Sequence, residues 1–316
     1  MKGLTDIPGL RVGHASDYEG ITGCTAILCE AGAVAGVSIG GSATGTEELD
    51  LLNPLHLTPN LHGVCLAGGS AFGLEAVSGV RRYLEKKGIG FQTAAAKVPL
   101  VAGAILYDLG IGKASSRPTR EMGEAAAEAA TSDAVKEGCV GAGTGATAGK
   151  AFGMKQAMKS GLGSFTVSLP RNVLVSAIAA VNSFGDVVDA SSGKIIAGAR
   201  KSADSDEFAG AAQLLKQRNP SATIGENTTL AVVATNARLT KVQATKLAQL
   251  AQHGLVRTIA PVHTIYDGDI IFAMSAGTES ADFTALGIAA AEAMSEAVMR
   301  AARLASPMGG LPAFHR

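Results

Sequence analysis

The sequence has no excess of charge of either sign, no long apolar run and no secretory leader. Its 27 basic and 27 acidic residues balance, and the basic ones are scattered, so we expect no nucleic-acid or anionic-lipid partner. The best candidate for a membrane span, residues 173–181, is under half of the roughly 20 residues required. The N-terminus, MKGLTDIPGLRVGHASD, has no apolar segment of the kind that marks a signal peptide. These absences predict a soluble cytoplasmic protein with no membrane partner.

Cysteine and histidine are also sparse. The six histidines show no HExxH or other ligand spacing, so we expect no metal and no other cofactor. The cysteines form no CxxC pair, and their apolar or glycine-rich surroundings predict reduced thiols in the core: Cys24, Cys29, Cys65 and Cys139. No fixed period runs through the chain, which excludes a solenoid.

Apolar residues and glycine are abundant. Apolar residues make up 47% of the chain and charged residues 17%, which predicts a compact globule. Glycine accounts for 40 of 316 residues, nearly double its usual share of about 7%. Three glycine clusters predict tight turns where the backbone approaches something closely: GGSATGTEE (40–48), AGGSAFGLEA (67–76) and GAGTGATAGK (141–150).

Helical and strand patterns alternate between these turns. Helical spacing predicts helices over residues 71–87, 121–136, 240–253 and 280–305. Short β-branched segments that are apolar on both faces predict strands over residues 172–182, 228–236 and 269–276. Such strands need a cover of helices or of a second sheet, so we predict an α/β layered sandwich. The polar residues 201–227 are expected to form a surface connection.

Several familiar motifs fail on inspection. The loop GAGTGATAGKA lacks the glycine and hydroxyl that a phosphate-binding loop requires, because Thr144 and Ala151 occupy those places. A loose GxGxxA in the same loop is followed by neither a clear apolar helix nor an acid about 20 residues on, so a dinucleotide site is not supported. GGSAFG misses the GxSxG nucleophile elbow because Phe72 replaces the last glycine.

Other polar residues stand directly beside buried strands. GENTTLAVVATNA (225–237) sets Asn227 and Thr228 against an apolar run, and HTIYDGDIIF places Asp267 and Asp269 at the start of a strand. Lys150 closes a glycine-rich loop. Read singly, these residues have simple structural explanations: the start of a strand, a DG turn and a surface lysine. Asn182, at the end of an apolar strand, could likewise only initiate a turn.

Taken together, five segments resemble the L-aminopeptidase/D-esterase (DmpA) family, which includes β-peptidyl aminopeptidases and nylon-oligomer hydrolases. The segments are LTDIPGLRVGHASD, CLAGGSAFGLEAVSGV, GAGTGATAGK, ENTTLAVVATNARLT and HTIYDGDIIFAM, and they span nearly the whole chain in order. The resemblance implies an αββα-type sandwich related to ornithine acetyltransferase. It also implies one hydrolase domain over residues 1–316 that cleaves itself before a Ser or Thr.

By position in GENTTLAVVATNA, the resemblance makes Thr228 the nucleophile and Asn227–Thr228 the scissile bond. The products would be an α fragment, 1–227, and a β fragment, 228–316. A strained turn before a rigid strand could hold the Thr228 hydroxyl against the Asn227 carbonyl for a nitrogen-to-oxygen acyl shift, followed by ester hydrolysis. The freed α-amine, with an ordinary pKa near about 7.7 to 8.0, could then act as general base for its own hydroxyl.

The resemblance also carries roles over to other residues. Asp267 and Asp269 match acidic catalytic positions and would orient Thr228 through charge-assisted hydrogen bonds. Asn182 matches an amide that binds the nucleophile region or the oxyanion, and Tyr107, in AILYDLG, a tyrosine that helps to hold the carbonyl oxygen. Lys150 matches the lysine that ends the glycine-rich loop. The sequence leaves the separate roles of Asn182, Lys150 and Tyr107 open.

The predicted function is therefore a self-processing aminopeptidase or amidase that forms an acyl-enzyme. The expected substrates are small peptides, amino-acid amides or esters, β-peptides or ω-amino-acid oligomers, among which the sequence does not choose. The resemblance also implies a homo-oligomer, a tetramer of processed units. An acyltransferase resembling ornithine acetyltransferase is the alternative, although GGSAFGLEA and HTIYDGD favour the hydrolase branch. The intact set of polar residues argues against a binding protein without turnover.

Overall fold

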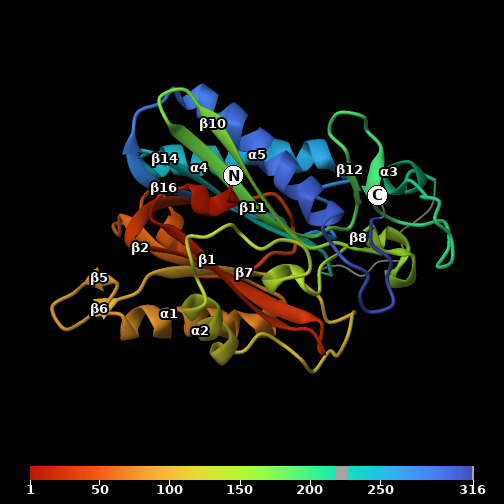
Figure 1. The fold of residues 1–316 in the computed structure, drawn as a ribbon, viewed down its shortest axis with the longest axis horizontal. Coiled ribbons are helices and arrows are strands. Elements are labelled where there is room, and N and C mark those ends of the chain that lie inside the picture. The colour runs from red at the N-terminus through yellow and green to blue at the C-terminus, as the bar shows by residue number, and fades with distance from the viewer. Residues whose placement is uncertain (218–225, 315–316) are drawn as a thin grey trace.

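The strands lie in two layers between two layers of helices (Figure 1). The computed structural model describes residues 1–217 and 226–314. Helices α4 (Lys241–Thr258) and α5 (Phe283–Arg303) cover one side, and α1 (Glu75–Lys86) and α2 (Arg120–Glu128) cover the other. The αββα-type sandwich expected from the sequence is thus confirmed.

The two strand layers share one long strand. Hydrogen bonding joins them in the order β10-β11-β14-β16-β2-β4-β7-β3, with β1 beside β2. Residues 22–29 of β2 pair with β1, whereas residues 34–39 pair with β16. The strands are β1 (Leu10–Asp17), β2 (Thr22–Ile39), β3 (Gly45–Glu47), β4 (Asn60–Ala67), β7 (Val101–Ile105), β10 (Leu162–Leu169), β11 (Val173–Asn182), β14 (Thr228–Ala237) and β16 (Ile270–Glu279).

Short elements complete the fold. Small pairs and a small sheet are formed by β5 (Phe91–Gln92), β6 (Lys97–Val98), β8 (Thr147–Ala148), β9 (Met158–Lys159), β12 (Asp186–Val188), β13 (Ile195–Ala197) and β15 (Ile259–Ala260). A one-turn helix, α3 (Ala211–Leu214), lies between β13 and β14 in the chain. Single 3-10 turns occupy Gly3–Asp6, Leu49–Leu52, Ser70–Leu74, Gly141–Gly143, Lys150–Phe152 and Met154–Gln156.

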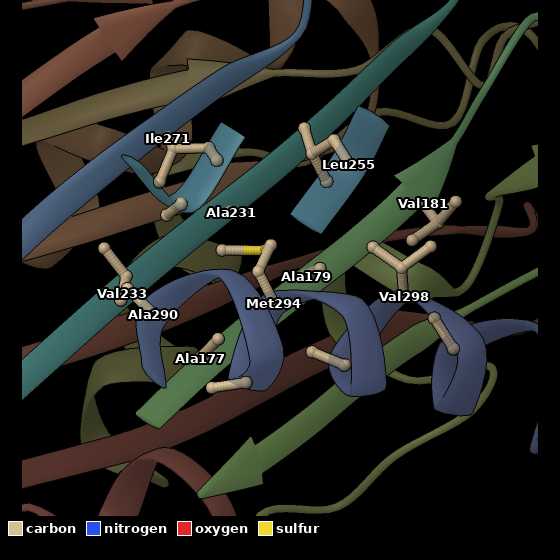
Figure 2. Close-up of a cluster of buried hydrophobic side chains, with 14 of the residues drawn as sticks. Ala177, Ala179, Val181, Ala231, Val233, Leu255, Ile271, Ala290, Met294 and Val298 are labelled. Carbon is tan, nitrogen blue, oxygen red and sulfur yellow. The ribbon is translucent and has the colours of Figure 1, made fainter. Parts of the chain in front are cut away.

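Three apolar cores separate the layers. Because side chains alternate along a strand, β14 turns Ala231 and Val233 toward α4 and α5 (Figure 2) and Leu230 and Val232 toward the second sheet. A third core lies between that second sheet and helices α1 and α2. The prediction that these strands are buried on both faces is confirmed. Along the start of β14, the even-numbered residues face the space between the two sheets.

Each of the four predicted helices is present, but the short helix α3 was not predicted and some of the predicted bounds were wrong. The helix predicted over residues 121–136 ends at Glu128, because Thr131 leaves it to exchange backbone hydrogen bonds with Val12 of β1, at 3.0 and 3.1 Å. The helix predicted over residues 240–253 begins after Thr240, as expected of a capping residue, but continues through Gly254 to Thr258. Gly254 therefore does not stop α4; it lies against α5.

Two further expectations need correction or lie outside the described residues. All four cysteines are free as predicted, but Cys139 is half-buried rather than in the core. Of the surface connection predicted over residues 201–227, residues 201–217 are described and include α3, whereas residues 218–225 lie outside the described range. At its end Asn227 is fully buried, so this part was wrongly assigned to the surface.

The close packing of α4 on α5 at Gly254 is testable by unfolding. A Cβ at Gly254 would lie 2.6 Å from Met294 Cβ and 2.7 Å from the Ala291 carbonyl oxygen, so Gly254→Ala should lower stability by about 1–3 kcal/mol. The control is Gly287→Ala in α5, where the new methyl meets the flexible tip of Leu250 at 2.5 Å. Urea unfolding of both variants should show the larger loss for Gly254→Ala; equal midpoints would contradict this packing.

Candidate functional site

The site forms where β14 begins, between two neighbouring strands. Thr228 is the first residue of β14, and its register partner on β11 is Asn182, the last residue of that strand. On the other side β14 runs parallel to β16, with Leu230 beside Ile270, which brings the residues before Ile270 level with Thr228. Strand register alone therefore brings Asn182 and the DGD segment to either side of Thr228.

The carbonyl oxygen of Asn227 is held by two donors. The Thr228 hydroxyl donates to it at 2.5 Å, and the backbone N–H of Gly268 donates to it at 2.8 Å. Thr228 is only 2% exposed and Asn227 is fully buried. A Cβ at Gly268 would lie 2.7 Å from Thr228 Oγ1, so only glycine leaves room for the hydroxyl. The arrangement polarises the one carbonyl that the hydroxyl could attack.

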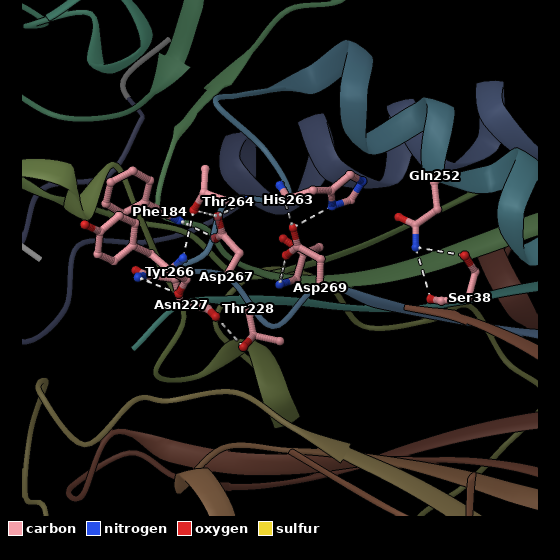
Figure 3. Close-up of polar contacts among 11 residues, drawn as sticks. Ser38, Phe184, Asn227, Thr228, Gln252, His263, Thr264, Tyr266, Asp267 and Asp269 are labelled. Carbon is pink, nitrogen blue, oxygen red and sulfur yellow. Dashed lines mark hydrogen bonds and ion pairs between the residues drawn. The ribbon is translucent and has the colours of Figure 1, made fainter. Parts of the chain in front are cut away.

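Asp269 holds the backbone that follows Thr228 (Figure 3). Its Oδ1 accepts the Thr229 N–H at 2.7 Å, and its Oδ2 accepts the backbone N–H and ring Nδ1 of His263 at 3.2 and 2.9 Å. Within the described residues, neither Asp269 nor Asp267 hydrogen-bonds Thr228 itself. In the intact chain the Asp269 carboxylate thus fixes the peptide plane after Thr228.

Asp267 holds the chain that extends beyond β11. Its Oδ1 accepts the Phe184 N–H at 3.1 Å, and its Oδ2 accepts the backbone N–H and hydroxyl of Thr264 at 3.2 and 2.6 Å. Burial, reinforced by the nearby carboxylate of Asp269, raises the pKa of Asp267 to about 6, although the hydrogen bonds oppose the shift. A DG turn alone does not need two buried carboxylates with this many donors, so the simple turn explanation is insufficient.

Lys150 and Asn182 form a buried polar pair beside Thr228. Lys150 Nζ donates to Asn182 Oδ1 at 2.6 Å, to the Asn182 carbonyl at 3.0 Å and to the Thr147 carbonyl at 3.3 Å. Lys150 is only 5% exposed, so it is not a surface lysine. Burial lowers its pKa to about 7, and the positive charge of Lys159 adds to this, whereas the charge of Asp267 opposes it.

Asn182 connects this pair to Tyr107. Its Nδ2 donates to the Tyr107 carbonyl at 2.8 Å, while its Oδ1 accepts the Thr147 N–H at 3.1 Å as well as Lys150. The contact between Tyr107 and the cluster therefore runs through the tyrosine backbone. Partial burial and the charge of Glu226 raise the pKa of the Tyr107 phenol. The proposed oxyanion role of that phenol stays a prediction.

Sequence reasoning missed groups that the fold brings to the site. These groups, the Gly268 N–H and the side chains of His263 and Thr264, all lie inside HTIYDGD (263–269), but sequence reasoning identified only its two acids as candidate catalytic residues. The glycine cluster at residues 40–48 was expected to bring its backbone close to something, and the turn at residues 40–43 confirms this. Its N–H groups donate to the carbonyls of Asp267 and Asp269 at 2.8 to 3.1 Å. The glycine cluster thus predicted that this turn makes a close contact, but not that the contact is with Asp267 and Asp269.

The described residues contain neither a membrane-spanning helix nor a cluster of metal-binding side chains. None of the helices there combines the length and apolar content needed to cross a bilayer. No group of three or more His, Cys, Asp or Glu side chains in residues 1–217 and 226–314 has the arrangement of a metal site.

The chain is similar in sequence to a known peptidase family and to several of its members. The profile of peptidase family S58 matches residues 2–314. An uncharacterized aminopeptidase of Mycobacterium leprae is 37% identical over 350 aligned positions, which cover 99% of this chain and 93% of the relative. A 6-aminohexanoate-oligomer endohydrolase of a Kocuria strain is 32% identical, with 94% of this chain and 85% of the relative covered. The resemblance drawn from the five segments is confirmed.

Solved structures agree on the fold. The L-aminopeptidase D-Ala-esterase/amidase of Ochrobactrum anthropi, described as a variant of the Ntn-hydrolase fold, superposes with a TM-score of 0.74 at 21% identity, covering 98% of this chain and 88% of the other. A β-aminopeptidase of a Burkholderia species gives a TM-score of 0.68 at 22% identity, covering 96% and 87%. At these identities the likeness concerns the arrangement of the backbone.

The burial of Lys150 predicts a particular pH dependence of stability. Between pH 7 and 10.5 the unfolded chain keeps the Lys150 proton that the folded chain releases, so this group makes stability rise with pH over that window. Lys150→Met should abolish this part of the rise, and Lys246→Met, at an exposed lysine of α4, should not. Urea midpoints measured from pH 6 to 10 check this; parallel curves for wild type and Lys150→Met would contradict it.

Proposed function

The chain belongs to peptidase family S58, and on that premise we propose that it is a self-cleaving hydrolase whose nucleophile is the N-terminal threonine created at Thr228. The family supports amide-bond hydrolysis. The observation that carries the finer proposal is the pair of donors, the Thr228 hydroxyl and the Gly268 N–H, on the carbonyl of Asn227. The fragments would be 1–227 and 228–316.

The first step would be an acyl shift from nitrogen to oxygen. Thr228 Oγ1 attacks the Asn227 carbonyl carbon, and the oxyanion that forms is stabilised by the Gly268 N–H that already donates to this oxygen. The C–N bond then breaks, and the hydroxyl proton is transferred to the departing Thr228 nitrogen. An ester joins Asn227 to Thr228 Oγ1. We assign Lys150 as the candidate to move this proton, because it hydrogen-bonds Asn182, the register partner of Thr228, and burial lowers its pKa to about 7.

Water completes maturation by hydrolysing that ester. The products are a carboxylate on Asn227 and a Thr228 that carries both a free amine and a free hydroxyl. Cleavage must also expose Thr228, which is 2% exposed in the intact chain. In the mature enzyme the Thr228 amine takes the hydroxyl proton as Oγ1 attacks a substrate amide, and water releases the acyl group.

A competing route would use the side chain of Asn227 in place of Thr228. Attack of Asn227 Nδ2 on its own carbonyl carbon would cut the same bond and leave a cyclic imide at the new C-terminus. Asn227 Nδ2 instead donates to the Tyr266 carbonyl at 3.2 Å, whereas the Thr228 hydroxyl already contacts the scissile carbonyl. These contacts favour the threonine route, and the two routes differ by one water in the mass of the α fragment.

The substrates we propose are small amides that end in an amine. Relatives bear the names aminopeptidase and 6-aminohexanoate-oligomer endohydrolase, which fits short peptides, amino-acid amides or ω-amino-acid oligomers. We further propose that the processed chain assembles as a homo-oligomer, a tetramer of processed units. An acyltransferase would use the same nucleophile, but the comparisons do not favour it.

Self-cleavage predicts two fragments of defined ends. Mass spectrometry of purified protein should find residues 1–227 ending in a free carboxylate and residues 228–316 beginning with threonine, while Thr228→Ala stays whole. The matched control is Thr229→Val, since the buried Thr229 hydroxyl has no partner among the described residues and its loss should leave cleavage intact. A wild-type chain that stays whole on long incubation would refute the proposal, and an imide end would refute the threonine route.

Turnover without an acceptor separates hydrolysis from acyl transfer. Mature protein should release the amine from amino-acid p-nitroanilides, a β-amino-acid amide or a 6-aminohexanoate oligomer in water alone. The rate should rise with pH as the Thr228 amine loses its proton near about 7.7 to 8.0. Each assay is repeated with glutamate as the acyl acceptor. A separate reaction with acetylornithine and glutamate tests directly for acetyl transfer. Acetyl transfer with no hydrolysis would contradict the assignment.

A further inference from the structure

We propose that His263 and Thr264 are positioning residues that clamp the two aspartates, and that this clamp sets the geometry of the Asn227–Thr228 bond. The inference rests on the proposed function, because its readout is cleavage and turnover at Thr228. Neither side chain touches the reacting atoms; each acts through the carboxylate that it holds. We call the two residues with Asp267 and Asp269 the aspartate clamp.

The clamp has a repeated pattern of donors (Figure 3). His263 uses its backbone N–H and its ring Nδ1 on Asp269 Oδ2, at 3.2 and 2.9 Å. Thr264, the next residue, uses its backbone N–H and its hydroxyl on Asp267 Oδ2, at 3.2 and 2.6 Å. Two consecutive residues thus each fix one oxygen of one aspartate by two hydrogen bonds.

The conformation of His263 makes this double grip possible. Its φ is +55°, in the left-handed region that most residues avoid and that Asn, Asp and His tolerate best. The ring also lies against Gly40, where a Cβ would come within 2.6 Å of Nδ1, and the Gly40 N–H donates to the Asp269 carbonyl at 2.9 Å. The ring is therefore held between the glycine turn and the carboxylate of Asp269.

The second carboxylate oxygen of each aspartate holds a different part of the site: that of Asp269 holds the backbone after Thr228, and that of Asp267 holds the chain beyond β11. Asp269 Oδ1 accepts the Thr229 N–H at 2.7 Å, and Asp267 Oδ1 accepts the Phe184 N–H at 3.1 Å. Between the two aspartates, the Gly268 N–H donates to the Asn227 carbonyl at 2.8 Å. A shift of either carboxylate would move this donor relative to the Thr228 hydroxyl, and a misplacement of about 1 Å can cost about 10²-fold in rate.

The chemistry of each donor suggests a matched pair of variants. A carboxylate requires that Nδ1 carry a proton, and among the described residues Nε2 has no partner. Asparagine places an amide N–H close to the position of Nδ1 and tolerates positive φ, whereas glutamine places it near that of Nε2. At residue 264, serine keeps the hydroxyl and valine keeps only the shape.

The experiment follows cleavage of His263→Asn, His263→Leu, Thr264→Ser and Thr264→Val over time, then measures kcat and KM of the matured fractions on the best amide substrate. We expect His263→Leu and Thr264→Val to slow cleavage and lower kcat by about 10²-fold with KM little changed, because the two residues act on the reacting geometry. His263→Asn and Thr264→Ser should stay within about tenfold of wild type. Circular dichroism confirms that each variant is folded.

The outcomes separate the two proposals. If wild type does not cleave, the proposed function fails. If wild type cleaves and His263→Leu and Thr264→Val match it, only the clamp fails. Equal losses in the conservative and non-conservative variants also overturn the clamp, since they indicate a structural role. If His263→Leu or Thr264→Val does not fold, the cleavage rates of His263→Asn and His263→Gln decide. A rate about tenfold or more faster for His263→Asn supports the clamp, and equal rates overturn it.

Discussion

One carbonyl oxygen, that of Asn227, constrains the whole site. It accepts both the Thr228 hydroxyl and the Gly268 N–H, and two donors reach one oxygen only if their chains enter the sheet side by side. The parallel register of β14 and β16 provides this, and the absence of a side chain at Gly268 leaves the space. The glycine turn at residues 40–43 then holds the carbonyls of Asp267 and Asp269, the residues on either side of Gly268.

The polar cluster around this carbonyl is costly to bury, and its position in the sandwich explains how the fold tolerates it. Burial lowers the pKa of Lys150 to about 7 and raises that of Asp267 to about 6, because removal from water disfavours the charged form of each side chain. Groups with such shifted pKa values gather at functional sites. Here Asp267 lies just before β16 and Lys150 contacts Asn182 at the end of β11, while the apolar middle of these two strands packs on both faces.

Sequence patterns predicted the elements that depend on local periodicity. The strands buried on both faces were found because β-branched residues run through them, and the long C-terminal helix because its small residues repeat. Gly254 was misread, since only the position of α5 shows that this glycine allows contact rather than ending a helix. The end of α2 was missed because its cause, the pairing of Thr131 with Val12, spans more than a hundred residues of sequence.

The residues of the site also fall into those that the sequence predicted and those that only the structure shows. Thr228, Asp267, Asp269, Asn182 and Lys150 could be named in advance because they stand in segments that resemble a known family, and the structure brings them together. His263 and Thr264 stood in the same segment but carried no pattern of their own, because a single histidine or threonine is common in turns. Their importance comes from which carboxylate oxygen they face, a property of the folded chain.

The strand order β11-β14-β16-β2 has a consequence for a chain cut before Thr228. Strands β14 and β16 would belong to the shorter piece, yet they lie between β11 and β2 of the longer one, so the two pieces are interleaved within a single sheet. Neither piece could then form its share of that sheet alone, and a denatured mixture would have to reassemble as two molecules. If the chain is cut there, the covalent link would serve only during folding, and this strand order would require the chain to fold before it is cut.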